Sequence, residues 1–344
     1  MVQNYPRGHK SLRGPFSRFN ASDTITWFEN HGVELKTEAD GRMFPSSNIS
    51  ETIVHCLTDT AQELGIETRT RTKVTRLEKL TNGYAVHLSE GAPLITQNVL
   101  IATGGLRGAE ARQVVRDAEH EFTSPVASLF TFHIDDERLD DLQGVSVPHG
   151  MAQAAGYKTE GPILITHWGL SGPGILKLSA WAARELSETQ YQFPLIINWT
   201  GSLNQEQVQT ILNKEREAHS TRQIHKRSLI EGITARLWSR LCEAAAIHPT
   251  QTWANLTKKQ TLSLVSQLTA ASFQVTGKST NKDEFVTCGG VKLKDLNLKT
   301  MESKAHPGLY FAGEVLDIDG VTGGFNFQAA WTTGFLAGRA IAEE

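Results

Sequence analysis

The sequence predicts an α/β protein of several domains (α+β multidomain), in which one sheet domain is interrupted by a long insertion. Two apolar segments, residues 98–105 and 308–313, each end on glycine. The continuous apolar run in each is typical of a strand that is covered on both faces of a sheet. Between them the chain changes character, first to short β-rich pieces and then to helical runs. We therefore expect a sheet built from both ends of the chain, with the middle inserted.

The C-terminal segment combines a strand, a glycine-rich turn and a helix. The strand at 309–312 runs into Gly313 and Glu314, and a long helix is predicted to start at 325–327. Between strand and helix lie three further glycines: Gly320, Gly323 and Gly324. A glycine turn lets backbone N–H groups approach a ligand without a Cβ in the way. A helix N-terminus adds a partial positive charge, so this segment predicts a cradle for a phosphate or another anionic group.

The mid-chain strand ends in the same manner. Residues 98–102 run into Thr103, Gly104 and Gly105. Strands that end on glycine, with ligands at their carboxyl ends, are typical of open α/β nucleotide folds. The loop lacks the Gly-x-Gly-x-x-Gly spacing and an acidic ribose partner about 20 residues on, so alone it is no dinucleotide fingerprint. A tight turn explains either glycine segment by itself, and the two together favour a nucleotide site.

Composition narrows the class of protein. The 344 residues are 39% hydrophobic, with a net charge of −3 from 34 Lys and Arg against 37 Asp and Glu. This balance argues against nucleic-acid binding through bulk charge, so no nucleic-acid partner is expected. The three cysteines are widely spaced, which fits a reducing cytoplasm. No signal region or membrane-length apolar run is present, so we expect a cytoplasmic protein without a membrane partner.

Local signals predict the elements of the first part of the chain. A helix at 22–31 ends at Gly32, and Ser50 is placed to cap a helix that runs through Leu64. Strand-like runs follow at 67–77, 84–88 and 99–103, and Asn82-Gly83 favours a hairpin between the first two. This succession is typical of one half of a nucleotide-binding sheet domain.

The changes in character predict four segments. We expect residues 1–121 and 273–344 to form the two parts of the sheet domain, 122–203 an inserted β-rich domain and 204–272 a helical module. Within the module, helical runs are predicted at 205–217, 228–246 and 257–269. One packing face is indicated by residues that repeat every four positions: Leu229, Ile233, Leu237 and Leu241.

Several polar residues are candidates for chemistry, but none has a positioned partner by spacing. His167 and Trp168 follow a strand, and Ser171 is placed to cap the next helix. His167 either faces a substrate or is a packed histidine, and the second interpretation is favoured. Cys288 is interpreted as a buried thiol, and Asp317 with Asp319 as solvated loop carboxylates. No metal cluster or Ser-His-Asp set can be assigned, so catalytic residues stay unknown and no metal is expected.

These stretches together resemble the HI0933-like (YhiN-type) flavoproteins, a family of NAD(P)/FAD-dependent oxidoreductases with an aminoacetone-oxidase-like fold. The matching segments span the chain in the family order: residues 5–8, 41–45, 102–105, 166–173, 286–290 and 308–338. The resemblance implies a glutathione-reductase-like FAD/NAD(P)-binding domain, with a β-barrel-like domain and a small helical module inserted into it. It further implies FAD as cofactor, with NAD(P)H as its reductant.

Motif matches assign roles to individual residues. The resemblance implies that Val74 lies beside the adenine through its backbone, and that Thr103, Gly104 and Gly105 lie near the adenosine. Gly313 and Glu314 are then expected near the ribityl and pyrophosphate groups. The turn that opens the last helix is expected to approach the flavin ring through Gly323, Gly324, Phe325 and Asn326.

One departure from the family pattern bears on the cofactor. Family members begin with a strand, a Gly-x-Gly-x-x-Gly loop and a helix, and this chain contains no such segment. We therefore expect a truncated N-terminus, an incomplete FAD site and an incomplete sheet domain. The leading hypothesis is hydride transfer between NAD(P)H, FAD and an unknown small organic substrate. The alternatives are a non-catalytic fragment or partner-dependent protein, and an FAD-dependent RNA-modifying enzyme.

Overall fold

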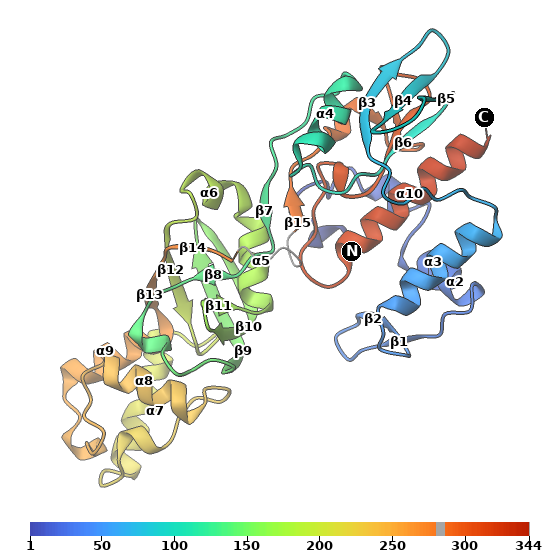
Figure 1. Ribbon diagram of the computed structural model, residues 1–344. Coiled ribbons are helices and arrows are strands. Elements are labelled where there is room, and N and C mark those ends of the chain that lie inside the picture. The colour runs from blue at the N-terminus through green and yellow to red at the C-terminus, as the bar shows by residue number, and fades with distance from the viewer. Residues whose placement is uncertain (280–285, 344) are drawn as a thin grey trace. The chain divides into compact units, whose positions relative to one another are not determined.

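The computed structural model in Figure 1 describes residues 1–279 and 286–343. The chain forms two compact units. Unit 1 comprises Met1–Val126 and Val286–Glu344, and unit 2 comprises Ala127–Phe285. Unit 1 is thus built from both ends of the chain, and unit 2 is inserted between them. This arrangement agrees with the sheet domain that the sequence predicts to be interrupted by a long insertion.

The main sheet of unit 1 has two parallel strands at one end. Its order is β16-β17-β18-β6, with bounds Leu296–Asn297, Glu302–Ser303, Leu309–Phe311 and Val99–Ile101. β18 pairs in parallel with β6, so that Phe311 lies opposite Ile101. All three residues of β18 are buried, which explains its unbroken apolar sequence. Because the pair is parallel, both glycine-containing loops leave from the same edge of the sheet.

A second, antiparallel sheet of unit 1 contains the predicted hairpin. It consists of β3 (Val74–Lys79), β4 (Tyr84–Leu88) and β5 (Leu94–Thr96). Lys79 pairs with Tyr84 across the Asn82-Gly83 turn, as the sequence indicates. β3 begins later than the predicted residue 67. Unit 1 also holds a two-stranded sheet, β1 (Leu35–Thr37) with β2 (Met43–Pro45), and the helix α4 (Ala109–Asp117).

Four further helices belong to unit 1: α1 (Arg13–Phe16), α2 (Ala21–Asn30), α3 (Glu51–Glu63) and α10 (Phe325–Glu343). Asn20 and Asp23 form a capping box at the start of α2. The predicted cap of α3 is wrong in its chemistry, because the Ser50 hydroxyl donates to the Glu51 carboxylate rather than accepting from the helix backbone. The remaining short elements around these are η1 (Val2–Asn4), η5 (Leu293–Asp295), η6 (Gly313–Val315) and β15 (Val286–Cys288). β7 (Val126–Ser128) starts at Val126 of unit 1 and continues into the residues of unit 2.

α10 starts where the sequence predicts, and its buried face carries few large apolar side chains. Phe327, in its first turn, is 66% exposed. The buried face consists of small and polar residues: Gln328, Ala329, Thr332, Thr333, Leu336 and Ala337. Their polar atoms are satisfied locally, since Thr332 donates to the Phe19 carbonyl and Gln328 to the Thr24 hydroxyl. Hydrophobic periodicity alone could not find a face that packs through hydrogen-bonding side chains.

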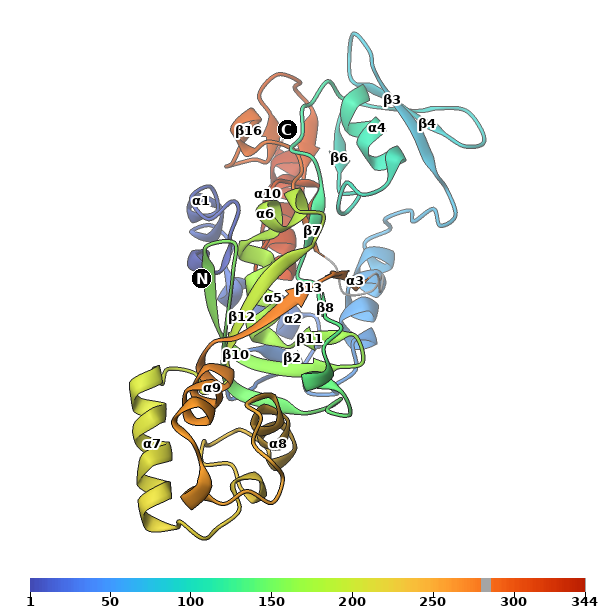
Figure 2. The same ribbon diagram turned by 90° about the vertical axis from the view of Figure 1, so that its left-hand side faces the viewer.

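Unit 2 contains an open sheet of seven strands. Its order is β13-β12-β9-β10-β11-β8-β14 and every pairing is antiparallel. No pairing closes this sheet among the residues that the structure describes, so a barrel is not supported. The bounds are Ala271–Val275, Phe193–Asn198, Ser146–Ala154, Tyr157–Thr166, Gly169–Ser171, Phe132–His133 and Gly277–Lys278. The helices α5 (Pro173–Trp181) and α6 (Ala183–Glu188) follow β11, and Figures 1 and 2 show α5 against the sheet.

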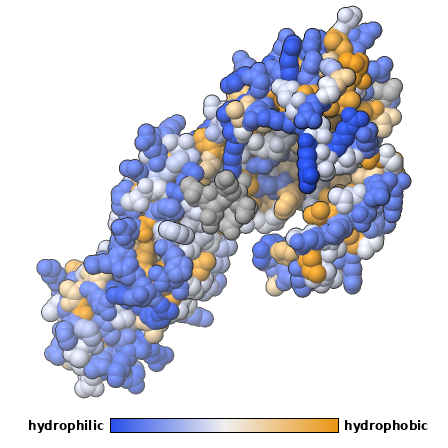
Figure 3. Space-filling view, in the orientation of Figure 1, coloured by the Kyte–Doolittle hydropathy of each residue, from blue (hydrophilic) through white to orange (hydrophobic). Residues whose placement is uncertain are grey.

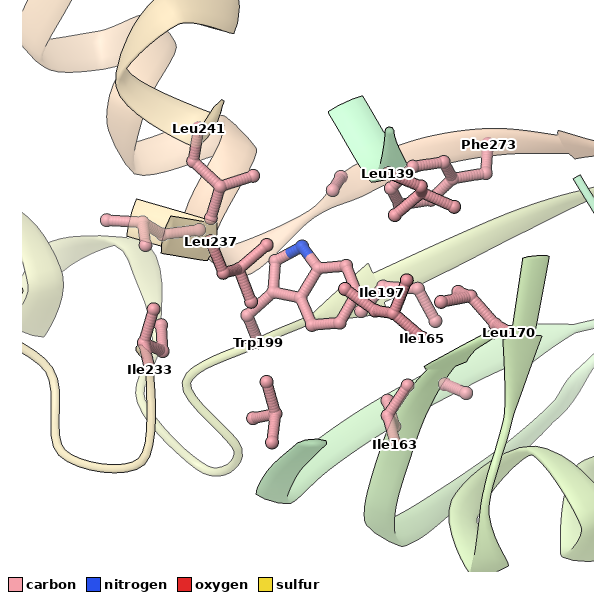
Figure 4. Close-up of a cluster of buried hydrophobic side chains, with 14 of the residues drawn as sticks. Leu139, Ile163, Ile165, Leu170, Ile197, Trp199, Ile233, Leu237, Leu241 and Phe273 are labelled. Atoms are coloured by element: carbon pink, nitrogen blue, oxygen red, sulfur yellow. The ribbon is translucent and has the colours of Figure 1, made fainter. Parts of the chain in front are cut away.

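The helices of unit 2 pack against the same core as its sheet. They are α7 (Gln205–Ala218), α8 (Ala235–Ala244) and α9 (Lys258–Thr269), with the short turns η2 (Glu137–Leu139), η3 (Ile224–Lys226) and η4 (Trp253–Asn255). α8 is shorter than predicted because Thr234 caps it. Figure 4 shows Leu237 and Leu241 of α8 pointing towards Trp199 at the end of β12. This cluster joins helices and strands into one apolar core. Among the described residues, no helix is long and apolar enough to cross a membrane.

Candidate functional site

The two glycine-containing loops of unit 1 are tied together by one carboxylate. Glu314 Oε2 accepts a hydrogen bond from the Gly105 backbone N–H (3.2 Å), and Oε1 accepts one from the Thr287 N–H (2.7 Å). Arg107 Nε donates to the Thr287 hydroxyl at 3.0 Å. The loops that follow β6 and β18 therefore meet strand β15 at Glu314. Thr287 was not singled out by the sequence, because a lone threonine in a strand has no distinguishing spacing.

The β18 loop is also fixed to the last helix. Gly313, whose φ of 77° favours glycine, donates its backbone N–H to Thr333 Oγ1 at 2.9 Å. The Thr333 hydroxyl in turn donates to the Ala329 carbonyl, one turn earlier in α10. Thr333 lies eight residues into α10, which corresponds to about 12 Å along the helix axis. The strand ends thus adjoin the middle of α10, and its N-terminus lies further along.

The start of α10 is shaped by a clamp around the glycine turn. Asn326 Oδ1 accepts from the Gly320 N–H (2.8 Å), and Asn326 Nδ2 donates to the Gly320 carbonyl (3.0 Å). The Tyr5 hydroxyl donates to the Phe325 carbonyl at 2.6 Å. Asn326 therefore holds the turn closed with its side chain. The backbone N–H groups of the first helical turn, which have no acceptors within the helix, remain available for an anion.

Two aspartates flank this turn and differ in their surroundings. Asp319 is fully buried and accepts both hydrogen bonds of a bidentate pair with Arg7. Burial lowers the pKa of the Arg7 guanidinium, but the hydrogen bond and charge of Asp319 outweigh it and leave that pKa above its ordinary value. Asp319 thus belongs to a structural ion pair, and the prediction that it is a solvated loop carboxylate is wrong. Asp317 Oδ2 accepts from Thr123, whereas its Oδ1 is buried without a hydrogen-bond partner among the described residues.

The free space at the glycines fits an anionic ligand. A Cβ added to Gly324, whose φ is 86°, would meet no atom within 4 Å. At Gly104 and Gly313 the nearest atom would lie at 3.9 Å and 3.8 Å. At Gly105, by contrast, a Cβ would collide with Thr287, so this glycine serves close packing. Open glycines at the strand ends and helix start are the arrangement that a phosphate or flavin requires.

The remaining predicted cofactor contacts differ in their surroundings, and only Val74 lies outside the two glycine-containing loops. Val74 begins β3 in the separate antiparallel sheet and is 37% exposed. Thr103 is exposed at the end of β6. Gly323 adjoins the Phe325 ring across the turn. Their roles beside the adenosine and the flavin ring stay predictions.

The segment that contains His167, Trp168 and Ser171 differs from what the sequence predicts. Gly172, with a φ of 89°, occupies the N-cap of α5, and Ser171 is the last residue of β11. Trp168 lies between β10 and β11, is 62% exposed, and stacks on His133 with ring centroids 5.8 Å apart. Cys288 is fully buried in unit 1, as expected for a structural thiol. In the part of the chain that the structure describes, no group of His, Cys, Asp and Glu could hold a metal.

Comparison with known proteins gives consistent matches over nearly the whole chain. The model of the HI0933-like protein Rossmann domain matches residues 1–340. The ribosomal RNA dihydrouridine synthase of Escherichia coli is 31% identical over 339 residues, which cover 96% of this chain and 81% of that protein. The protein of the same name from Haemophilus influenzae is 28% identical over 97% of this chain and 82% of its own length. The 3-dehydro-bile acid delta(4,6)-reductase of Clostridium scindens is 24% identical over 96% and 82%.

Proposed function

The chain belongs to the HI0933-like Rossmann-domain family of flavoprotein oxidoreductases, and from this premise we propose that it reduces a uracil base in RNA with FAD and NAD(P)H. The sequence alone favoured a small organic substrate and no nucleic acid. The two relatives named as ribosomal RNA dihydrouridine synthases instead favour the RNA-modifying alternative. The net charge of −3 excludes only binding through bulk charge, and it leaves local contacts open.

One structural observation carries the cofactor part of the proposal. β6 and β18 are parallel neighbours, and the loops that leave their carboxyl ends are joined through Glu314. In open α/β sheets, nucleotide cofactors bind outside the carboxyl ends of such strands. The open glycines supply backbone N–H groups, and the start of α10, about 12 Å along the helix from the strand ends, adds positive helix potential.

Individual residues of this chain would have distinct roles towards FAD. Gly313 and Glu314 would hold the ribityl and pyrophosphate part, and Gly104 would let the β6 loop approach the adenosine side. The turn at Gly323 and Gly324 would let the first N–H groups of α10 approach the flavin ring. Asn326 would hold that turn in shape, as its two hydrogen bonds to Gly320 already do.

The chemistry follows from the substrate's double bond. Reduction of the C5–C6 bond of uracil takes up one hydride and one proton, and one NAD(P)H is oxidised in the overall reaction. When bound, a flavin supplies the hydride. The chain would contribute binding and orientation of the flavin and positive helix potential beside its anionic reduced form. No catalytic side chain is assigned.

The test is to supply the purified protein with FAD, NAD(P)H and ribosomal RNA that lacks its modifications. We expect a bound-flavin absorbance spectrum and uridines that gain two hydrogen atoms by nucleoside mass spectrometry. Glu314→Gln should lower flavin affinity, because one carboxamide oxygen cannot accept from both the Gly105 and Thr287 N–H groups. Glu110→Gln, at an exposed position of α4, is the control. Flavin-loaded protein that leaves every uridine unchanged would contradict the RNA substrate.

A second candidate is reduction of a small unsaturated molecule. The bile acid reductase match, at 24% identity over 96% of this chain, favours it. The same flavin-loaded protein should then oxidise NAD(P)H with a conjugated enone and not with RNA. NAD(P)H oxidation that depends on the enone alone decides for this candidate.

A further inference from the structure

We propose that a cavity among the helices of unit 2 binds the phosphodiester backbone of RNA, an inference that rests on the proposed function and adds a contact site to it. The cavity has a volume of about 370 Å³. It is lined by Glu215, Thr221, Arg222, Gln223, Lys226, Arg227, Leu229 and Trp253. Three of these side chains are cationic and one is anionic.

The single acid in the lining is already engaged. Glu215 Oε2 lies 3.1 Å from His219 Nδ1, and Oε1 lies 3.8 Å from an Arg222 guanidinium nitrogen. Lys226 and Arg227 are exposed, and neither has an ion-pair partner among the residues that the structure describes. Two uncompensated cations therefore remain at the cavity, with Arg222 beside them. Unpaired cations grouped around a hollow are suited to a phosphate, which Arg and Lys both bind.

The segment that carries these cations is held rigidly. His225, between the cations, is buried, with Nδ1 3.0 Å from Ser239 Oγ and Nε2 2.9 Å from the Ile247 carbonyl. The Trp238 indole N–H donates to the Ile224 carbonyl at 2.9 Å. Arg222 on one side of Ile224 and His225, and Lys226 and Arg227 on the other, therefore project from an anchored backbone, so RNA binding would not have to order the loop first. A preorganised site loses less free energy on binding.

A backbone contact joins the two walls of the cavity. The Trp253 N–H donates to the Arg222 carbonyl (3.1 Å), and the Ile224 N–H donates to the Gln251 carbonyl (3.0 Å). Gln223 and Thr252 form an antiparallel bridge between these bonds. Trp253 is almost fully buried and, with Leu229, gives the cavity an apolar lining. The shape is therefore fixed by main-chain bonds rather than by mobile side chains.

The charge of this region contrasts with that of the chain. Residues 204–270 contain nine Lys and Arg against five Glu, and the rest of the chain contains 25 against 32 Asp and Glu. The helical part, whose visible face is largely hydrophilic in Figure 3, thus carries a net positive charge, whereas the rest of the chain taken together is negative. A polyanion places many charges in a field that extends beyond one cavity and therefore gains more from it than a small anion does. The local balance therefore favours an RNA backbone as the occupant.

Two matched double variants test the assignment. Lys226→Gln with Arg227→Gln removes two charges at the cavity, and Lys258→Gln with Lys259→Gln removes two exposed charges of α9 outside its lining. Binding of fluorescently labelled ribosomal RNA is measured over a range of salt, without flavin or NAD(P)H. We expect the cavity pair to weaken binding on the order of tenfold and to reduce the salt slope by about 1 to 2. The control pair should do neither.

The outcomes separate this site from the proposed reaction. Equal losses for both pairs, or no loss for the cavity pair, overturn the site. The proposed RNA site is also overturned if inorganic phosphate or a mononucleotide binds at Lys226 and Arg227 but the double variant that lacks these two cations binds RNA as tightly as the wild type. If the wild type forms dihydrouridine and the cavity variant binds RNA as the wild type does, the cavity site is refuted and the proposed reaction is not. Cavity-dependent RNA binding by a wild type that forms no dihydrouridine refutes the reaction alone.

Discussion

Two helices with similar amphipathic sequences are treated differently by the fold. α8 in unit 2 buries Leu237, Trp238, Leu241 and Cys242. α3 in unit 1 is longer, yet it buries no residue, and Leu57 on it is 40% exposed. The same kind of pattern thus produces a packed helix in one unit and an uncovered apolar face in the other. An amphipathic pattern indicates which face of a helix can pack, but it does not supply the partner.

In unit 1, polar side chains connect segments that lie far apart in the sequence. Tyr5 bonds to the start of α10, Arg7 pairs with Asp319, and Gln328 reaches Thr24. Both units have an apolar cluster, and that of unit 2, part of which Figure 4 shows around Trp199, is the larger. The two units should therefore respond to different substitutions, and three experiments test this difference.

The largest effect is expected when the buried ion pair of unit 1 is broken. Arg7→Met leaves the carboxylate of Asp319, which is fully buried, without its bidentate partner. Removing one member of a buried pair typically costs about 3 to 5 kcal/mol. The free energy of unfolding is measured by urea denaturation. Arg240→Met, whose partner Asp141 is 92% exposed, should cost no more than about 1 kcal/mol.

Equal losses in these two variants would mean that the connections of unit 1 do not depend on burial. The contrast between the units would then rest on apolar packing alone.

The helix comparison itself is sharpened by a matched pair of truncations. Leu237→Ala removes a side chain with no exposure and should cost about 2 to 5 kcal/mol, because it leaves a cavity in the core. Leu57→Ala on α3 should change the free energy of unfolding by no more than about 0.5 kcal/mol. Both are measured in urea under the same conditions. A loss at Leu57 as large as that at Leu237 would show that the apolar face of α3 is covered in solution.

Much of the fold could be predicted from local signals. The start of α10, the hairpin at Asn82-Gly83 and the glycine-ended strands follow from turn chemistry and buried runs, and the structure confirms them. The buried face of α10 could not be predicted, because Thr332 and Thr333 pack through hydrogen bonds to distant segments. The local sequence also does not indicate whether an amphipathic helix will be covered by another element, as the unburied α3 shows.

The candidate site was only partly accessible in the same way. Gly313, Glu314 and Gly324 could be singled out because glycine after a strand marks close backbone approach. The partner of Glu314, Thr287, comes from a segment far away in the sequence, and no spacing connects them. Lys226 and Arg227 have no distinguishing spacing in the sequence, and their grouping around a cavity depends on how the fold anchors their backbone.

The smallest effect is a pH dependence that belongs to unit 1. His120 lies against Phe311 of β18 and beside His306, with Nε2 2.8 Å from Ser303 Oγ. Burial, followed by the charge of His306, lowers the pKa of His120 below its ordinary value of 6.5, and Asp295 opposes this only in part. The unfolded chain therefore binds a proton more readily, so stability should fall as pH drops below about 6.5 and level off below the lowered pKa. Melting temperatures between pH 7.5 and about 4.5 should decline less for His120→Gln than for the wild type, while His55→Gln on the exposed face of α3 should follow the wild type. If the melting temperature declined equally in all three proteins, the acid sensitivity would not come from His120. Titration of a buried histidine beside β18 would then not distinguish unit 1 from unit 2.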